Sequence, residues 1–108
     1  MAFPVTAGAA NAKAQPEKCG GASWYALTSR TASGERMNPS HLTAAHKSLS
    51  FGTKIKITNQ RNGKSVVVRV NDRGPFKKGR VVDVSKAAAG QLGLISSGVG
   101  RICYKVVG

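Results

Sequence analysis

Apolar and polar residues alternate most clearly in the middle of the chain, where they predict two paired strands. Isoleucines alternate with lysines across 53–58, and valines recur at every second position across 65–70. This two-residue period is typical of a strand with one buried face. The Asn62-Gly63 pair lies between the two segments and is a strong signal for a tight turn. The pattern therefore predicts an antiparallel hairpin.

Shorter apolar runs predict the remaining elements. Ser85 is a favourable N-cap for a helix that continues to Leu92, and Gly93 is a favourable stop. Residues 28–40 are polar and interrupted by glycine and proline, which is typical of a loop. Further strands are predicted at 23–25, 42–45, 80–84 and 99–107. About six short strands with one or two short helices indicate a mainly β fold, a small barrel.

The length of 108 residues fits a single domain, which we assign to 19–108. Residues 1–18 are rich in alanine and predict a flexible leader or a residual signal segment, with Ala10-Asn11-Ala12 as a candidate cleavage site. No stretch of the sequence reaches the length of a transmembrane segment. We expect a monomer.

The formal net charge of +13 predicts attraction to polyanions. Nucleic acid, anionic lipid headgroups and the acidic polymers of a bacterial envelope are all candidates, and charge alone does not choose among them. Basic residues are not interleaved with aromatic ones as in single-strand nucleic-acid platforms. We therefore expect no specific nucleic-acid partner.

Two cysteines, Cys19 and Cys103, lie near opposite ends of the predicted domain. An even count fits a disulfide in an oxidising compartment, and two free buried thiols are the alternative. Neither His41 nor His46 shows ligand spacing with a cysteine, which argues against zinc. We expect no metal and no cofactor.

The segment VNDRGPF (70–76) places Asp72, one of only four acidic residues, directly after the valine run. Strand parity puts Asp72 on the same side as Val66 and Val70. Burial there would favour a protonated acid, whereas the neighbouring arginines favour the carboxylate. An Asx turn before Gly74 is the structural alternative.

Five motifs then occur in order: ASWY, TASGE, LTAAHKSLSFGT, NGKSVVVRVNDRGPF and GRVVDVS. Over 20–107 the chain resembles the rare lipoprotein A (RlpA)-like family. The resemblance implies a six-stranded double-psi β-barrel, a fold shared with expansins and barwin-like proteins. It also implies lytic transglycosylase activity on peptidoglycan glycan strands poor in stem peptides, in the periplasm or outside the cell. The segment 26–30 is shorter than in many members, so we expect a reshaped groove there.

The resemblance assigns the essential acid of the family to Asp72, its partner histidine to His46 and a further groove acid to Glu35. A lytic transglycosylase uses the 6-hydroxyl of the sugar as nucleophile, so one carboxyl group can serve as acid and then as base. A hydrolase that uses water needs two. The residues expected to bind or orient the sugar are Trp24, Tyr25, Asn71, Arg73 and Phe76.

Two alternatives stay open for these residues. The aromatic side chains fill the small core instead of stacking on sugar rings, or the protein binds polysaccharide without cutting it, as an expansin-like wall-loosening module. The expected partners in both functional readings are peptidoglycan glycan strands and acidic envelope polymers.

Overall fold

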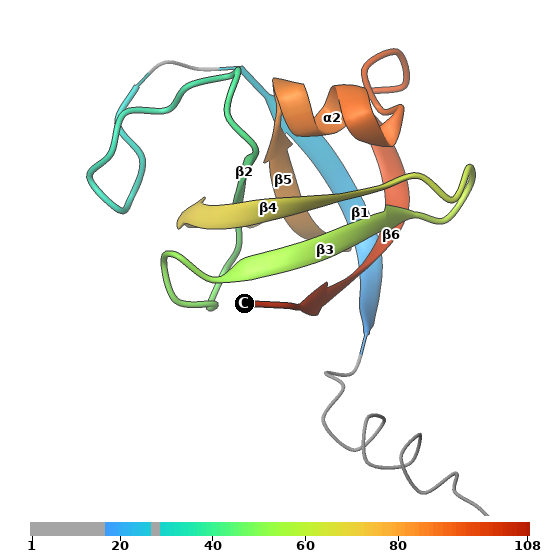
Figure 1. Cartoon of the computed structure of the whole chain (residues 1–108), viewed down its shortest axis with the longest axis horizontal. Coiled ribbons are helices and arrows are strands. Elements are labelled where there is room, and N and C mark those ends of the chain that lie inside the picture. The colour runs from blue at the N-terminus through green and yellow to red at the C-terminus, as the bar shows by residue number, and fades with distance from the viewer. Residues whose placement is uncertain (1–16, 27–28) are drawn as a thin grey trace, which may run out of the picture.

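The computed structural model describes residues 17–26 and 29–108 (Figure 1). Most of the predicted leader, 1–16, lies outside the described residues, as do residues 27 and 28 of the short segment 26–30. The elements are β1 (Lys18–Tyr25), β2 (Thr43–Ala45), β3 (Lys54–Asn59), β4 (Ser65–Asp72), β5 (Arg80–Ser85), α2 (Lys86–Leu92) and β6 (Val99–Val106). All the predicted strands and the predicted helix are confirmed, with shifts at their ends.

The strands of the described residues form a closed barrel in the order β1-β5-β2-β4-β3-β6. Strands β1 and β5 run parallel, as do β2 and β4, while the other neighbouring pairs are antiparallel. Pairing of β1 with β6 closes the sheet, so none of the described strands has an edge left open to pair with another chain. The mainly β, six-stranded barrel predicted from the sequence is confirmed.

The predicted hairpin is formed by β3 and β4. Ile55 and Ile57 are fully buried, and Lys54 and Lys56, which alternate with them, are exposed. The turn has Gly63 at a φ of 76°, a left-handed conformation that glycine adopts without the steric cost of a Cβ. The isoleucines therefore face the interior of the barrel, and the lysines that alternate with them face solvent.

The barrel interior is filled by branched aliphatic side chains from the strands, and α2 covers one end of it (Figure 1). The side chain of Ser85 accepts a hydrogen bond from the Ala88 N–H, and Gly93 ends the helix at a φ of 77°. Ala88, Ala89 and Leu92 point into the core. Both predicted helix ends are therefore confirmed.

A disulfide joins Cys19 of β1 to Cys103 of β6, at positions that are directly paired in the sheet. The predicted disulfide is confirmed. It links residues separated by 84 positions in the sequence, and a loop of that length corresponds to about 4–5 kcal/mol of stabilisation in the chain-entropy model. The disulfide fastens the two strands whose pairing closes the barrel.

Within the described part of the chain, no helix has the length and apolar character needed to span a bilayer.

Candidate active site

The candidate site begins at an irregularity in the pairing of β2 with β4. Ala44 pairs with Val70, whereas Ala45 pairs with Asp72, so Asn71 is an extra residue in β4. Because cross-strand partners share a face and successive residues alternate, Asp72 lies on the opposite face from Val70. The prediction from strand parity is therefore wrong: the bulge turns Asp72 away from the core-facing valines.

The Asp72 carboxylate has two oxygens in different surroundings. Oδ1 accepts hydrogen bonds from the backbone N–H groups of Ala32 and Arg73, both at 2.8 Å. Oδ2 accepts one from the Tyr25 hydroxyl at 3.2 Å. An Asx turn would accept from the residue two positions on, but here one donor is Ala32, 40 positions away. Asp72 therefore anchors the loop between β1 and β2.

Tyr25 ends β1 and places its hydroxyl between negative charges. Burial raises the pKa of Tyr25 above its usual range, and the charge and hydrogen bond of Asp72, with the charge of Asp83, raise it further. The phenol therefore keeps its proton over the physiological range and is a permanent donor toward Asp72 Oδ2.

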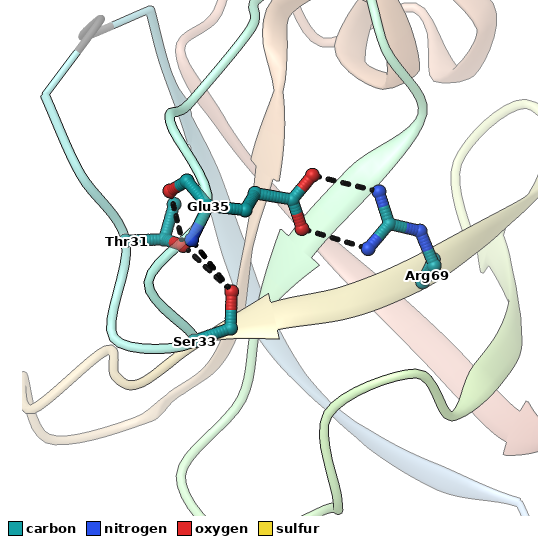
Figure 2. A network of polar contacts seen from close by, with 4 residues as sticks. All are labelled: Thr31, Ser33, Glu35 and Arg69. Atoms are coloured by element: carbon teal, nitrogen blue, oxygen red, sulfur yellow. Dashed lines mark hydrogen bonds and ion pairs between the residues drawn. The ribbon is translucent and has the colours of Figure 1, made fainter.

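Glu35 lies in the same loop and forms a bidentate ion pair with Arg69 of β4 (Figure 2). Nη1 and Nη2 of Arg69 donate to Oε1 and Oε2 of Glu35 at 2.8 and 3.0 Å. The hydrogen bonds from Arg69 hold the pKa of Glu35 below its usual value, and one from Asn71 adds to this against the effect of burial. The loop itself is shaped by Thr31, whose hydroxyl donates to the Glu35 carbonyl at 2.8 Å (Figure 2). Glu35 is thus an ionised, fixed carboxylate.

His46 directly follows β2 and is buried, with 8% of the residue exposed. Its Nδ1 accepts from the N–H groups of Ser48 and Leu49, both at 3.1 Å. Burial lowers the pKa of His46, and Arg73, Lys18 and Lys47 lower it further by charge repulsion. The neutral ring therefore carries its hydrogen on Nε2, which lies 2.7 Å from the Tyr104 hydroxyl.

The His46 imidazole makes these contacts and, within the described residues, none with the Asp72 carboxylate. The connection runs through the backbone instead. The His46 N–H donates to the Asp72 carbonyl at 3.1 Å. Arg73 donates to the carbonyls of His46 and Leu49 at 3.0 and 2.7 Å, and its guanidinium lies 4.1 Å from the centre of the Phe51 ring. The His46 ring thus fixes a turn whose backbone is hydrogen-bonded to Asp72 and Arg73.

The remaining predicted sugar-binding residues fall into different environments. Trp24 is partly buried and packs against the core, as the core-filling alternative expects. Phe76 is 80% exposed, so that alternative does not hold for Phe76. Asn71 is 1% exposed and contacts Glu35 rather than the surface. Arg73 is tied to the turn after β2.

Sequence reasoning did not assign Asp83 of β5 to the site. Asp83 pairs with Arg80 at 3.8 Å, and Ser23 donates a hydrogen bond to Asp83. In the sheet, Ala45 has Asp72 on one side and Asp83 on the other. Asp83 alternates with the buried Val82 and Val84, and this pattern was a signal that it faces outward.

A closed barrel with this strand order and this mixture of parallel and antiparallel pairs is a double-psi β-barrel. The fold matches the Streptomyces papain inhibitor with a TM-score of 0.73 at 21% identity, covering 89% of this chain and 98% of that one. It also matches an expansin variant from Clavibacter michiganensis, solved in complex with cellohexaose, with a TM-score of 0.70 at 22% identity. That match covers 86% of this chain and 51% of the expansin.

Residues 17–104 match the family model described as lytic transglycolase. The chain is 57% identical over 93 residues to a probable endolytic peptidoglycan transglycosylase RlpA from Synechocystis, covering 83% of this chain and 29% of the relative. It is 46% identical over 95 residues to the endolytic peptidoglycan transglycosylase RlpA from Neisseria meningitidis serogroup A, covering 85% and 40%. The chain belongs to this lytic transglycolase family, and it spans less than half the length of these relatives.

Proposed function

We propose that this domain cuts peptidoglycan glycan strands internally as a lytic transglycosylase and leaves 1,6-anhydro ends, with Asp72 as acid and base. Family membership and the names of the relatives support the activity. The observation that carries the assignment to Asp72 is the unequal bonding of its two oxygens. One is held by two backbone N–H donors and the other faces a single hydroxyl.

On this basis we place the catalytic proton on one atom of Asp72. A hydrogen on Oδ1 would point at two N–H donors, so the acid form carries its proton on Oδ2, beside the Tyr25 hydroxyl. That proton moves to the glycosidic oxygen as the bond from C1 to the leaving sugar breaks. The Oδ2 oxygen then accepts the proton of the 6-hydroxyl as O6 bonds to C1, which restores the acid without water. A single carboxyl group completes the cycle.

The surrounding residues support this chemistry in distinct ways. The Glu35–Arg69 pair presents a fixed acceptor and a fixed donor to sugar hydroxyls, and buried Asn71 orients Glu35. The exposed ring of Phe76 offers a flat apolar surface for a sugar face. Because the ring of His46 contacts Tyr104 and backbone, we assign it a positioning role. It fixes the turn that binds the Asp72 carbonyl and the Arg73 guanidinium.

The net charge of +13 supports attraction to glycan strands and acidic polymers of the bacterial envelope. The disulfide supports an oxidising location, the periplasm or the cell exterior. We propose that the domain acts there as a monomer and without a cofactor.

The test is product analysis on purified, peptide-free glycan strands by mass spectrometry. The expected products end in 1,6-anhydromuramic acid. Asp72→Asn keeps an oxygen for the two backbone donors but removes the transferable proton, so turnover should fall by about 100- to 10,000-fold. Glu17→Gln is the control, since it removes an exposed carboxylate outside the site.

Three outcomes would contradict the proposal. Products with reducing ends would indicate hydrolysis by water. Wild-type activity in Asp72→Asn would exclude Asp72 as the acid. Retention on insoluble cell wall with no soluble product would instead support the expansin-like binding module.

A further inference from the structure

A cavity of about 200 Å³ lies on the side of His46 where its ring meets Tyr104. It is lined by the start of β1, the end of β6 and the turn after β2, and it is partly open to solvent. Tyr104 and His46 are 6% and 8% exposed, and the cavity is lined further by Lys18, Leu49 and Lys105, among others. We call it the Tyr104 pocket. Its volume is several times the share of about 30 Å³ that one water molecule occupies in the liquid, so it can hold a small organic group.

The hydrogen bonds around His46 leave one buried donor unused. Since Nδ1 already accepts two N–H groups, Nε2 is the protonated nitrogen and donates to the Tyr104 oxygen. The hydroxyl hydrogen of Tyr104 then has no acceptor among the residues that the structure describes. Burial raises the pKa of Tyr104, so the hydroxyl keeps that hydrogen. A buried donor without an acceptor is unfavourable, and a ligand acceptor in the pocket would satisfy it.

The charges around the pocket specify what kind of acceptor fits. Two of its lining residues, Lys18 and Lys105, are cationic, and none of its lining residues is acidic. The Lys18 charge reaches far enough to affect His46. Leu49 and Val106 add an apolar wall. One hydroxyl donor, two ammonium groups and a short aliphatic wall complement a carboxylate on a small aliphatic body. A phosphate is less well matched, since its oxygens point in all directions and those directed at the wall of Leu49 and Val106 would have no polar partner.

We propose that the Tyr104 pocket binds the carboxylate of a short aliphatic acid, as a site separate from the Asp72 carboxylate. This assignment rests on the proposed function. The natural source of the carboxylate is then the lactyl group that each muramic acid residue carries along the glycan. A carboxylate at the end of a stem peptide has the same chemistry, so the experiments must distinguish the two sources. Occupation of the pocket would hold the strand while another part of it lies at Asp72.

The first experiment needs no catalysis. D-lactate is titrated into the isotopically labelled protein, and the ring resonances of Tyr104 and His46 are followed by NMR, with uncharged D-lactamide as the matched ligand. We expect saturable shifts with lactate and none with lactamide. Tyr104→Phe should weaken lactate binding about tenfold, the loss expected for one hydrogen bond to a charged group. Lys18→Gln should weaken it several-fold, and the exposed Lys64→Gln should not change it.

Thermal unfolding of each variant shows whether it folds, and Lys18→Gln tests the pocket even if Tyr104→Phe does not. Equal shifts with lactate and lactamide, or the absence of shifts, would overturn the proposal. Equal or tighter binding of inorganic phosphate would overturn the preference for carboxylate.

The second experiment identifies the source. Cleavage is compared on peptide-free strands, on the same strands with their lactyl carboxyls converted to amides, and on strands bearing stem peptides. We expect the amidated strands to be cut about tenfold more slowly, and Lys18→Gln to reduce that difference. Full cleavage of peptide-bearing strands would instead identify the peptide carboxylate as the ligand.

The two proposals fail separately in this comparison. Equal cleavage of free and amidated strands would remove the pocket from glycan recognition and leave the proposed activity intact. No cleavage of any strand would contradict the activity, while the lactate titration would still decide whether the pocket binds carboxylates.

Discussion

Asp72 and His46 lie at the ends of neighbouring parallel strands and share a backbone hydrogen bond, yet their side chains enter opposite surroundings. The Asp72 carboxylate accepts from a loop, from its neighbour and from a tyrosine hydroxyl on the outer face of the barrel. The His46 ring is buried against Tyr104 and two backbone N–H groups. Two residues that the family resemblance groups as one catalytic pair thus differ in what they touch.

This difference fits the two proposed roles, proton transfer by Asp72 and positioning by His46. A group that transfers a proton needs an oxygen that is not saturated by hydrogen bonds, and among the described residues Asp72 Oδ2 accepts only the bond from the Tyr25 hydroxyl. A group that fixes geometry needs saturated, buried hydrogen bonds, and the His46 ring has those. The bulge at Asn71 produces the separation, because it rotates Asp72 outward while its backbone stays paired to the turn that His46 organises.

The largest effect that sharpens this comparison is expected at His46. His46→Ala leaves two turn N–H groups and the Tyr104 hydroxyl without a partner, which should cost about 2–4 kcal/mol of unfolding free energy. The loosened turn should lower kcat on glycan strands by tenfold or more. His46→Asn restores an acceptor for the turn, so it should recover much of both losses. Denaturant unfolding and steady-state kinetics measure the two quantities.

The pH–rate profile distinguishes a positioning role from a catalytic one. If the ring only positions, His46→Asn keeps the shape of the wild-type profile. If the ring transfers a proton, a limb of the profile disappears in that variant and stability recovers without activity. The second result would show that the His46 ring takes part in proton transfer.

A smaller effect is expected on the Asp72 side, at Tyr25. Tyr25→Phe removes the hydroxyl that faces Asp72 Oδ2 and leaves the ring and the two donors to Oδ1 in place. We expect kcat to fall about tenfold with little change in KM, because the proton-bearing oxygen loses its orienting partner. Stability should change by about 1 kcal/mol or less. A change confined to KM would show that Tyr25 binds sugar instead of orienting the acid.

The barrel was predictable from sequence because its signals are local. Alternating isoleucines and valines, the Asn62-Gly63 turn and the Ser85 cap each act within a few residues. The start of β1 was missed, since Gly20 and Gly21 have low strand propensity. Glycine occurs here because of a tertiary contact. A Cβ on Gly20 would lie 2.6 Å from a Val81 methyl group, so the close approach of β1 to β5 requires glycine.

The site was predictable only in its residue types. The family motifs supplied Asp72, Glu35 and His46, but the contacts among them depend on long-range pairing. The bulge at Asn71 is set by register with β2, which strand parity does not report. The Ala32 donor to Asp72 is a backbone N–H and has no side-chain signature. The contact of His46 with Tyr104 spans 58 positions, so no local pattern could orient the ring.

The smallest effects are expected in the dependence of stability on pH, where the two regions should separate again. The pKa of His46 is lowered in the folded protein, so the unfolded chain binds a proton more readily. Its contribution is therefore complete above the unfolded value of about 6.5 and is lost as pH falls through the folded pKa. Glu35 also has a lowered pKa, and its contribution is lost only below the unfolded value of about 4.3.

Unfolding temperatures measured from pH 8 to pH 3 should therefore fall in two stages. His46→Asn should remove the stage that begins near pH 6.5, and Glu35→Gln should reduce the one below about pH 4.3. The Glu35 stage should be the weaker, because its ion pair with Arg69 is partly exposed and water screens it. A first stage that persists in His46→Asn would mean that the ring is protonated as easily in the folded protein as in the unfolded one. The buried, neutral imidazole on which the comparison with Asp72 depends would then be excluded.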